Sequence, residues 1–259
     1  MEDLRLDQPD TTVFNAPSNR NTNIWRYMDF TKFISLLNSG SLHLTRCDQF
    51  DDTIDEFVPP NEVNTDLERE TLADRQSLSK TQTSTTSDTF RKLQKRYVFI
   101  NCWHIHEGES IALWRRYTRT NEAIAIQTRF SKLREALPAN YYIGQVNYVD
   151  SQAYKRCRNE RLYPIMHKRK SFEHERELRV CYVDTYEFSQ HMKNPEDYHL
   201  SDKTRLVETI PVDVQSLVET VRVAPGAPSW LVELVKDSLI LFGYRLPVSQ
   251  ANTTDSLYP

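Results

Sequence analysis

The chain has 259 residues, of which 39% are hydrophobic and 27% charged, and its formal net charge at pH 7 is −3. This length and composition are typical of a globular protein with a sizeable core, and the net charge argues against a general nucleic-acid coat. The five glycines form neither a GxGxxG nor a GxxxxGK[ST] loop, which disfavours a P-loop or Rossmann nucleotide enzyme.

The first part of the chain predicts an arm followed by strand, helix and strand. Residues 1–22 are polar, and we expect a flexible N-terminal arm. Residues 24–28 predict a short strand, after which Asp29 can cap a helix that ends at Gly40. Residues 41–46 alternate like a second strand. Arg26 and Arg46 are therefore expected inside or at the ends of these strands.

A polar insertion follows at about residues 58–96. It begins with Pro59-Pro60 and contains two polar helical stretches. Between them, residues 78–88 offer almost no apolar area to offset the entropy of ordering, so we expect them to be the most mobile internal segment.

Residues 97–104 carry the strongest strand pattern, with Cys102, His104 and His106 expected on one face. A metal site there is disfavoured because no further ligands follow at finger-like spacing. Ser110 can cap the next helix, whose inward stripe includes Trp114. The four cysteines form no CxxC pair and no apolar run is long enough to span a membrane, so we expect a cytoplasmic protein with reduced thiols.

The rest of the chain alternates strands and helices irregularly. Strands are predicted at 123–128, 141–149, 179–183, 206–211 and 221–224, and helices at 130–137, 152–162 and 230–242. The last helix should pack through Leu231, Leu234, Val235, Leu239 and Phe242. The pattern predicts one α+β domain over residues 23–249, with a mainly antiparallel or mixed sheet flanked by helices, and a C-terminal tail at 250–259.

Residues 168–183 are the centre of the functional hypothesis. If a strand begins near Glu173, then Glu173, Glu175, Glu177 and Arg179 share one face. Neighbouring carboxylates repel each other, so they need cations beside them. One interpretation is a solvent-exposed or structural charge cluster. The other is that one or two carboxylates face a cleft beside a guanidinium.

Several short motifs together resemble the uncharacterised bacterial DUF2971 family. They are Arg26-Tyr27-Met28 before a helix, Phe50-Asp51-Asp52, Cys102-Trp103-His104, Ser110 with Trp114, Lys168, and Phe172-x-x-Glu175-x-Glu177-x-Arg179. The resemblance spans roughly residues 24–249. The acidic turn differs from the family's Asp-Pro-then-Glu pattern, because Thr53 and Asp55 follow Asp52.

A looser resemblance is to the Arg–Ser–Glu layout of ADP-ribosyltransferases, which implies NAD as the substrate. It implies that Glu177 stabilises the positive charge that develops on the ribose, and that Glu175 orients or deprotonates the acceptor. Arg26 would bind the pyrophosphate, Tyr27 or Trp114 would stack on nicotinamide, and Ser110, Arg46 and Arg179 would complete the site. The implied protein modifies an unknown acceptor macromolecule, for example as a toxin or phage-defence effector.

Two alternatives from other classes stay open. The first is a metal-dependent nuclease, with nucleic acid as the partner, although Glu177-Leu178-Arg179 stands where such enzymes would have Glu-x-Lys. The second is a non-catalytic binding or sensor module, in which the Arg and Glu side chains form a buried ion-pair network that holds the sheet together.

Overall fold

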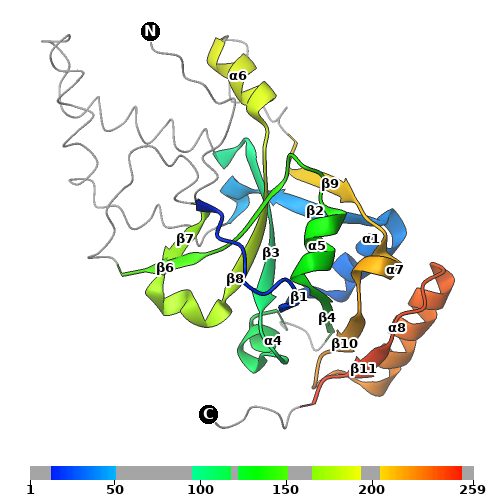
Figure 1. The fold of residues 1–259 in the computed structure, drawn as a ribbon. Helices are drawn as coiled ribbons and strands as arrows, with labels where there is room; N and C mark the ends of the chain where they lie inside the picture. Colours follow the sequence, from blue (N-terminus) through cyan, green and yellow to red (C-terminus); the bar gives the residue numbers. More distant parts are fainter. Residues whose placement is uncertain (1–12, 51–94, 118–121, 151–164, 194–204, 253–259) are drawn as a thin grey trace, which may run out of the picture.

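Strand β3 (Val98–Ile105), the strand predicted most strongly from the sequence, lies at the centre of the sheet in the computed structural model (Figure 1). The structure describes residues 13–50, 95–117, 122–150, 165–193 and 205–252. On one edge, β3 pairs antiparallel with β8 (Glu177–Val183) from Val98 to His104.

The other edge of β3 is shared by two strands. β2 (Ser41–Arg46) pairs with its beginning, at Phe99 and Ile100, and β1 (Asn23–Asp29) pairs with its end, at His104 and Ile105. Between these two short ladders, residues 101–103 pair with β8 alone among the described strands. The sheet is therefore split between β1 and β2.

Further strands extend the sheet on both sides of the split. β4 (Ala123–Arg129), β10 (Thr220–Val223) and β11 (Val248–Gln250) follow β1, while β9 (Val207–Pro211) follows β2 and β5 (Tyr142–Gln145) follows β8. Among these described pairs, β10 and β11 run parallel and the others run antiparallel. A separate parallel ladder joins β6 (Asn147–Val149) to β7 (His167–Arg169), so the strand predicted at 141–149 is two strands.

The helices cover this sheet and complete a single α+β domain with a mixed, mostly antiparallel sheet, as predicted. In the described ranges the α-helices are α1 (Phe30–Ser39), α4 (Ile111–Tyr117), α5 (Phe130–Ala136), α6 (Thr185–Lys193), α7 (Val214–Leu217) and α8 (Ser229–Leu241). The same ranges contain the 3-10 turns η2 (Cys47–Gln49) and η5 (Lys170–Glu175). Both predicted caps of α1 are confirmed: the Asp29 carboxylate accepts from the backbone N–H of Lys32, and Gly40 is left-handed with φ 56°.

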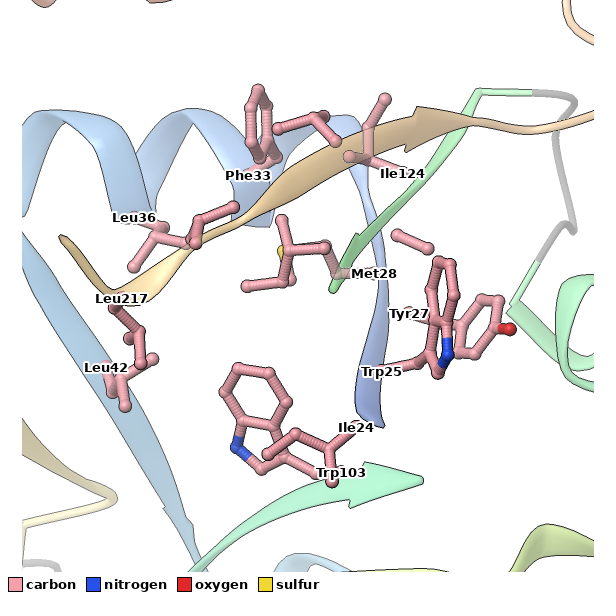
Figure 2. Packing of buried hydrophobic residues seen from close by; sticks show 14 of the residues in the cluster. Ile24, Trp25, Tyr27, Met28, Phe33, Leu36, Leu42, Trp103, Ile124 and Leu217 are labelled. Carbon is pink, nitrogen blue, oxygen red and sulfur yellow. The ribbon is translucent and has the colours of Figure 1, made fainter. Parts of the chain in front are cut away.

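The main core lies between the sheet and the helices on one face of it. Figure 2 shows Phe33 and Leu36 of α1 and Leu217 of α7 facing Met28, Leu42 and Trp103 of the sheet. On the opposite face of β3 and β8, a smaller cluster packs around Ile100 and Cys181 and includes Val13 from the N-terminal segment. Buried apolar area of this kind supplies most of the stability of such a domain.

Three predictions need correction. Leu234 of α8 is 40% exposed, and the helix packs through Leu231, Val235 and Leu239 instead. The described end of the arm expected at residues 1–22 is partly packed, because Val13 is buried and Asn15 forms an isolated antiparallel bridge with Gln145. Strand β11 reaches Gln250, which we had expected to begin the tail.

Two predicted segments fall largely or wholly on residues outside the described ranges. The insertion at 58–96, apart from its last two residues, and the helix at 152–162 lie outside the described part of the chain. None of the helices in the described ranges is long and apolar enough to cross a membrane.

Candidate functional site

Four charged side chains form a buried charge network on the face of the sheet opposite α1. They are Lys168, Glu175, Glu177 and Arg179, and each residue is at most 2% exposed. The Lys168 ammonium lies 2.9 Å from an oxygen of Glu175 and 2.9 Å from Oε2 of Glu177. The Arg179 guanidinium binds both oxygens of Glu177, at 3.0 and 3.1 Å. Each carboxylate therefore has at least one buried cation beside it.

The local backbone explains how both carboxylates become buried together. β8 begins at Glu177, two residues before the predicted strand at 179–183 but after the start near Glu173 considered for the shared face, because residues 170–175 form η5 and Arg176 adopts a left-handed conformation with φ 43°. Glu173, which we expected on the same face, is exposed instead and pairs with Lys170 at 2.6 Å. From Glu177 onward the expected alternation holds, since Arg179 points into the network while Leu178 lies in the main core.

Neighbouring side chains connect the network to α4 and β3. Arg116 of α4 forms an ion pair with Glu175, and the Arg116 side chain is 42% exposed. The guanidinium carbon of Arg116 and the ammonium of Lys168 lie 6.0 and 5.8 Å from the centre of the Phe172 ring, within the range of cation–π attraction. His104 donates from Nδ1 to the backbone carbonyl of Glu175 at 2.9 Å, because a carbonyl can only accept.

The charges of the network control its protonation. Burial by itself would raise the pKa of Glu177, but Arg179 and Lys168 outweigh burial and hold this pKa well below its usual range. Burial would lower the pKa of Arg179, yet the Glu177 carboxylate outweighs that effect and raises it. Both groups are therefore fully ionised at neutral pH.

A pocket of about 310 Å³ lies at the split in the sheet, and we call it the split pocket. Residues of both sheet faces contribute to it, because β1 and β2 are not paired to residues 101–103 of β3. Its described lining comprises Arg26, Tyr27, Met28, Lys32, Leu36, Ser41, His43, Thr45, Phe50, Ile100, Asn101, Cys102 and Val207.

The described lining of the split pocket is cationic. Arg26 and Lys32 bring positive charge, and no residue of this described lining is acidic, although Lys32 also forms an ion pair with Asp29 at 3.1 Å. Burial and the charge of Arg26 lower the pKa of His43, so its imidazole is neutral at pH 7. Cys102 lies at the border of the buried charge network, since both Glu177 and Arg179 influence its thiol; burial raises the pKa of that thiol.

Glu177 contributes to the wall of a different hollow, of about 530 Å³. Gln145, Tyr148, His174 and Arg176 also line it. The backbone N–H of Glu177 donates to the Tyr148 hydroxyl at 2.8 Å. The Glu177 carboxylate itself is directed to Lys168 and Arg179, so the contribution of this residue to the hollow does not free its charge.

The structure divides the predicted site residues into groups. Arg26 lines the split pocket, whereas Glu175, Glu177 and Arg179 form the buried charge network. Arg46 binds Asp48 through two hydrogen bonds of 2.7 and 2.9 Å, and it is not in the described lining of either hollow.

Tyr27 of β1, Ser110 directly before α4 and Trp114 of α4 form a third group, and Tyr27 also belongs to the described lining of the split pocket. The Ser110 backbone N–H donates to the Tyr27 hydroxyl at 2.9 Å, and the Trp114 ring meets the Tyr27 ring edge-on at 5.0 Å. Tyr27 also lies 6.0 Å from the His104 ring, which links this group to the network. Among the described pockets, none contains Arg26, Ser110 and Glu177 together.

Sequence reasoning missed Asn101 and His43 and did not assign a site role to Lys168. Lys168 stood in the quoted motif, but its partners on β8 are set by the tertiary fold. Asn101 interrupts an otherwise apolar strand, and a polar residue in a strongly apolar strand is the signal that could have identified it.

A scan against protein-family models found no match to this chain, and a search of curated proteins found no similar sequence. The resemblance to DUF2971 therefore stays a prediction. In the described ranges, no three His, Cys, Asp or Glu side chains are grouped to hold a metal ion.

Proposed function

We propose that this protein is a binding or sensor module for a small phosphate-bearing ligand, and that the ligand occupies the split pocket. The observation that supports this proposal is the pair of cations, Arg26 and Lys32, on a described lining without an acidic residue. A guanidinium presents a planar fork that matches phosphate oxygens, and the ammonium adds a point charge. The volume of 310 Å³ is at the lower end of the range for small-molecule sites.

In this proposal the buried charge network has a structural role. Lys168, Glu175, Glu177 and Arg179 are almost completely removed from water, and their charges compensate each other within 3.1 Å. The network connects β7, η5 and β8 and lies directly beneath Cys102 of the split pocket. It would thus hold the strand that carries the pocket floor.

The second candidate is an NAD-dependent ADP-ribosyltransferase-like enzyme, and the adjacency of β1, β3 and β8 is the observation in its favour. Trp25 of β1, His104 of β3 and Glu177 of β8 are directly paired across these three strands. The Arg26 strand and the Glu177 strand therefore lie on either side of one central strand, but Arg26 alternates with Trp25 and so points to the other face of the sheet from Glu177. In this reaction nicotinamide leaves with the electrons of its bond to ribose, and an acceptor nucleophile loses its proton to Glu175 and bonds to the ribose carbon.

Isothermal titration with pyrophosphate, AMP and NAD tests the binding proposal. Arg26→Gln should weaken binding by about 1.5–3 kcal/mol, or roughly 10- to 150-fold, because it removes a charge-assisted hydrogen bond. Arg129→Gln is the matched control, because Arg129 lies at the end of neighbouring β4 and pairs with Glu219 away from the pocket. Equal loss in both variants, or no binding of any of the three probes, would contradict the proposal.

The same preparation separates the enzymatic alternatives. NAD turnover by the wild-type protein that is lost in a folded Glu177→Gln variant would establish the transferase candidate. Nucleic-acid cleavage that depends on added Mg²⁺ would instead establish the nuclease alternative.

A further inference from the structure

Asn101 is the least exposed polar side chain on the described lining of the split pocket, and its amide oxygen makes no hydrogen bond. The residue is 2% exposed, and its Nδ2 donates to the backbone carbonyl of His43 at 2.7 Å. The His43 carbonyl can only accept, so the amide nitrogen must face it and the amide oxygen must face elsewhere. This oxygen, Oδ1, is buried and has no hydrogen-bond partner in the described part of the chain.

An unsatisfied buried amide oxygen is costly, because it has lost its water without gaining a donor. The position of Asn101 explains why this oxygen lies at a pocket. It stands on the stretch of β3 that pairs with neither β1 nor β2, and its side chain reaches across the split to β2 in place of a main-chain ladder. The unsatisfied acceptor therefore belongs to a residue that lines the split in the sheet.

The positive charge of Lys32 lies at the other end of the split pocket from Asn101. The Lys32 side chain is 69% exposed and therefore marks the mouth, whereas Asn101 at 2% exposure marks the floor. Between them the lining includes apolar and aromatic residues, among them Leu36, Phe50 and Ile100. A ligand that matches this order has an anionic end at the mouth, a flat apolar body, and a hydrogen-bond donor at the floor.

We infer that the ligand is a mononucleotide, or the corresponding half of a dinucleotide, bound with its base inward. An N–H group of the base or of its amide substituent donates to Asn101 Oδ1, while the phosphate stays at the mouth with Arg26 and Lys32. This inference rests on the proposed function and specifies its ligand. The pocket volume of 310 Å³ is too small for a ligand much larger than one nucleotide to be enclosed completely.

The test compares ligands that differ in one part. AMP, GMP, CMP, UMP and nicotinamide mononucleotide each carry a base or ring with an N–H donor, whereas ribose 5-phosphate carries none and lacks the base. Titration of the wild-type protein should show at least one of the five binding roughly 10-fold or more tightly than ribose 5-phosphate. For AMP, removal of the exocyclic amino group, as in purine riboside 5′-monophosphate, isolates the donor from the ring.

Asn101→Leu provides the matching change in the protein. It should remove the roughly 10-fold preference for the best nucleotide while leaving the affinity for ribose 5-phosphate within about 2-fold of the wild type. Thr209→Val, a change on β9 beside β2 and outside the described lining of the split pocket, is the control and should keep the preference. If Asn101→Leu does not fold, the wild-type comparison of donor-bearing ligands with ribose 5-phosphate still decides.

Failure of the nucleotide inference and failure of the proposed phosphate site give different binding results. If ribose 5-phosphate binds as tightly as every nucleotide, or if Asn101→Leu weakens all ligands equally, the inference is refuted while the phosphate site stands. If pyrophosphate, ribose 5-phosphate and all nucleotides fail to bind, the proposed function itself is refuted.

Discussion

Replacing Glu177 with Gln removes one negative charge from the buried charge network and keeps the shape of the side chain. In the wild type, Glu177 accepts from Arg179 at 3.0 and 3.1 Å and lies 2.9 Å from the Lys168 ammonium. The variant leaves Arg179, which is 0% exposed, without its carboxylate partner and turns an amide N–H toward a cation. Breaking a buried ion pair in this way typically costs about 3–5 kcal/mol of unfolding free energy.

For a domain of this size, each kcal/mol shifts the melting temperature by about 2–4 °C, so Glu177→Gln should lower it by roughly 6–20 °C at pH 7. The shift should also depend on pH. The pKa of Glu177 is lower in the folded protein than its ordinary value of 4.5, so its stabilising contribution is present above pH 4.5 and is lost as the pH falls below it. The difference between the variant and the wild type should therefore shrink under acid conditions.

Differential scanning calorimetry at pH 7 and at several values below pH 4.5 measures both effects. Glu173→Gln is the control, because Glu173 precedes Glu177 by four residues but is 54% exposed in its pair with Lys170, and its loss should cost no more than about 0.5 kcal/mol. A Glu177→Gln protein with wild-type melting temperature at pH 7 would refute the structural role of the network. If that protein had also lost NAD turnover, the catalytic role of Glu177 would replace it.

The remaining predictions concern the core, one glycine and one histidine. Leu239→Ala should cost about 2–5 kcal/mol in urea unfolding, whereas the partly exposed Leu234→Ala should cost far less; equal losses would mean that α8 packs differently. Gly144→Ala should destabilise by about 1–3 kcal/mol, since its new Cβ would lie 2.6 Å from the backbone of the N-terminal segment, while Gly108→Ala meets nothing within 4 Å and should be tolerated. Burial and Arg176 lower the pKa of His106 to about 4, so stability should fall as the pH drops from about 6.5 to 4, and His106→Gln should flatten this dependence in a pH series of unfolding curves.

Local patterns in the sequence determined much of the fold. The cap at Asp29, the left-handed Gly40 and the alternation of residues 41–46 are short-range signals, and the structure has a helix and strands at those places. The apolar stretch at 97–104 correctly indicated the central strand. These features depend on backbone preference and side-chain period within one segment, which a sequence shows directly.

Contacts between distant segments decided the rest. The stripe of apolar residues on α8 is wider than the buried face, and only its packing places Val235 inside and leaves Leu234 exposed. The spacing of Glu175 and Glu177 correctly suggested a shared environment, but the Lys168 partner comes from β7, against which η5 packs. These outcomes depend on which segments become neighbours.

The split pocket shows most clearly that local sequence patterns do not predict contacts between distant segments. The sequence by itself pointed to Arg26 on a strand, and to carboxylates on a later strand, as groups able to bind and act on an anionic ligand. Only the tertiary structure separated them, because β3 pairs with β2 at one end and β1 at the other, and the pocket forms in the gap. Strand pairing joins residues far apart in the chain, so no local pattern encodes which edge is shared or where Asn101 faces an opening.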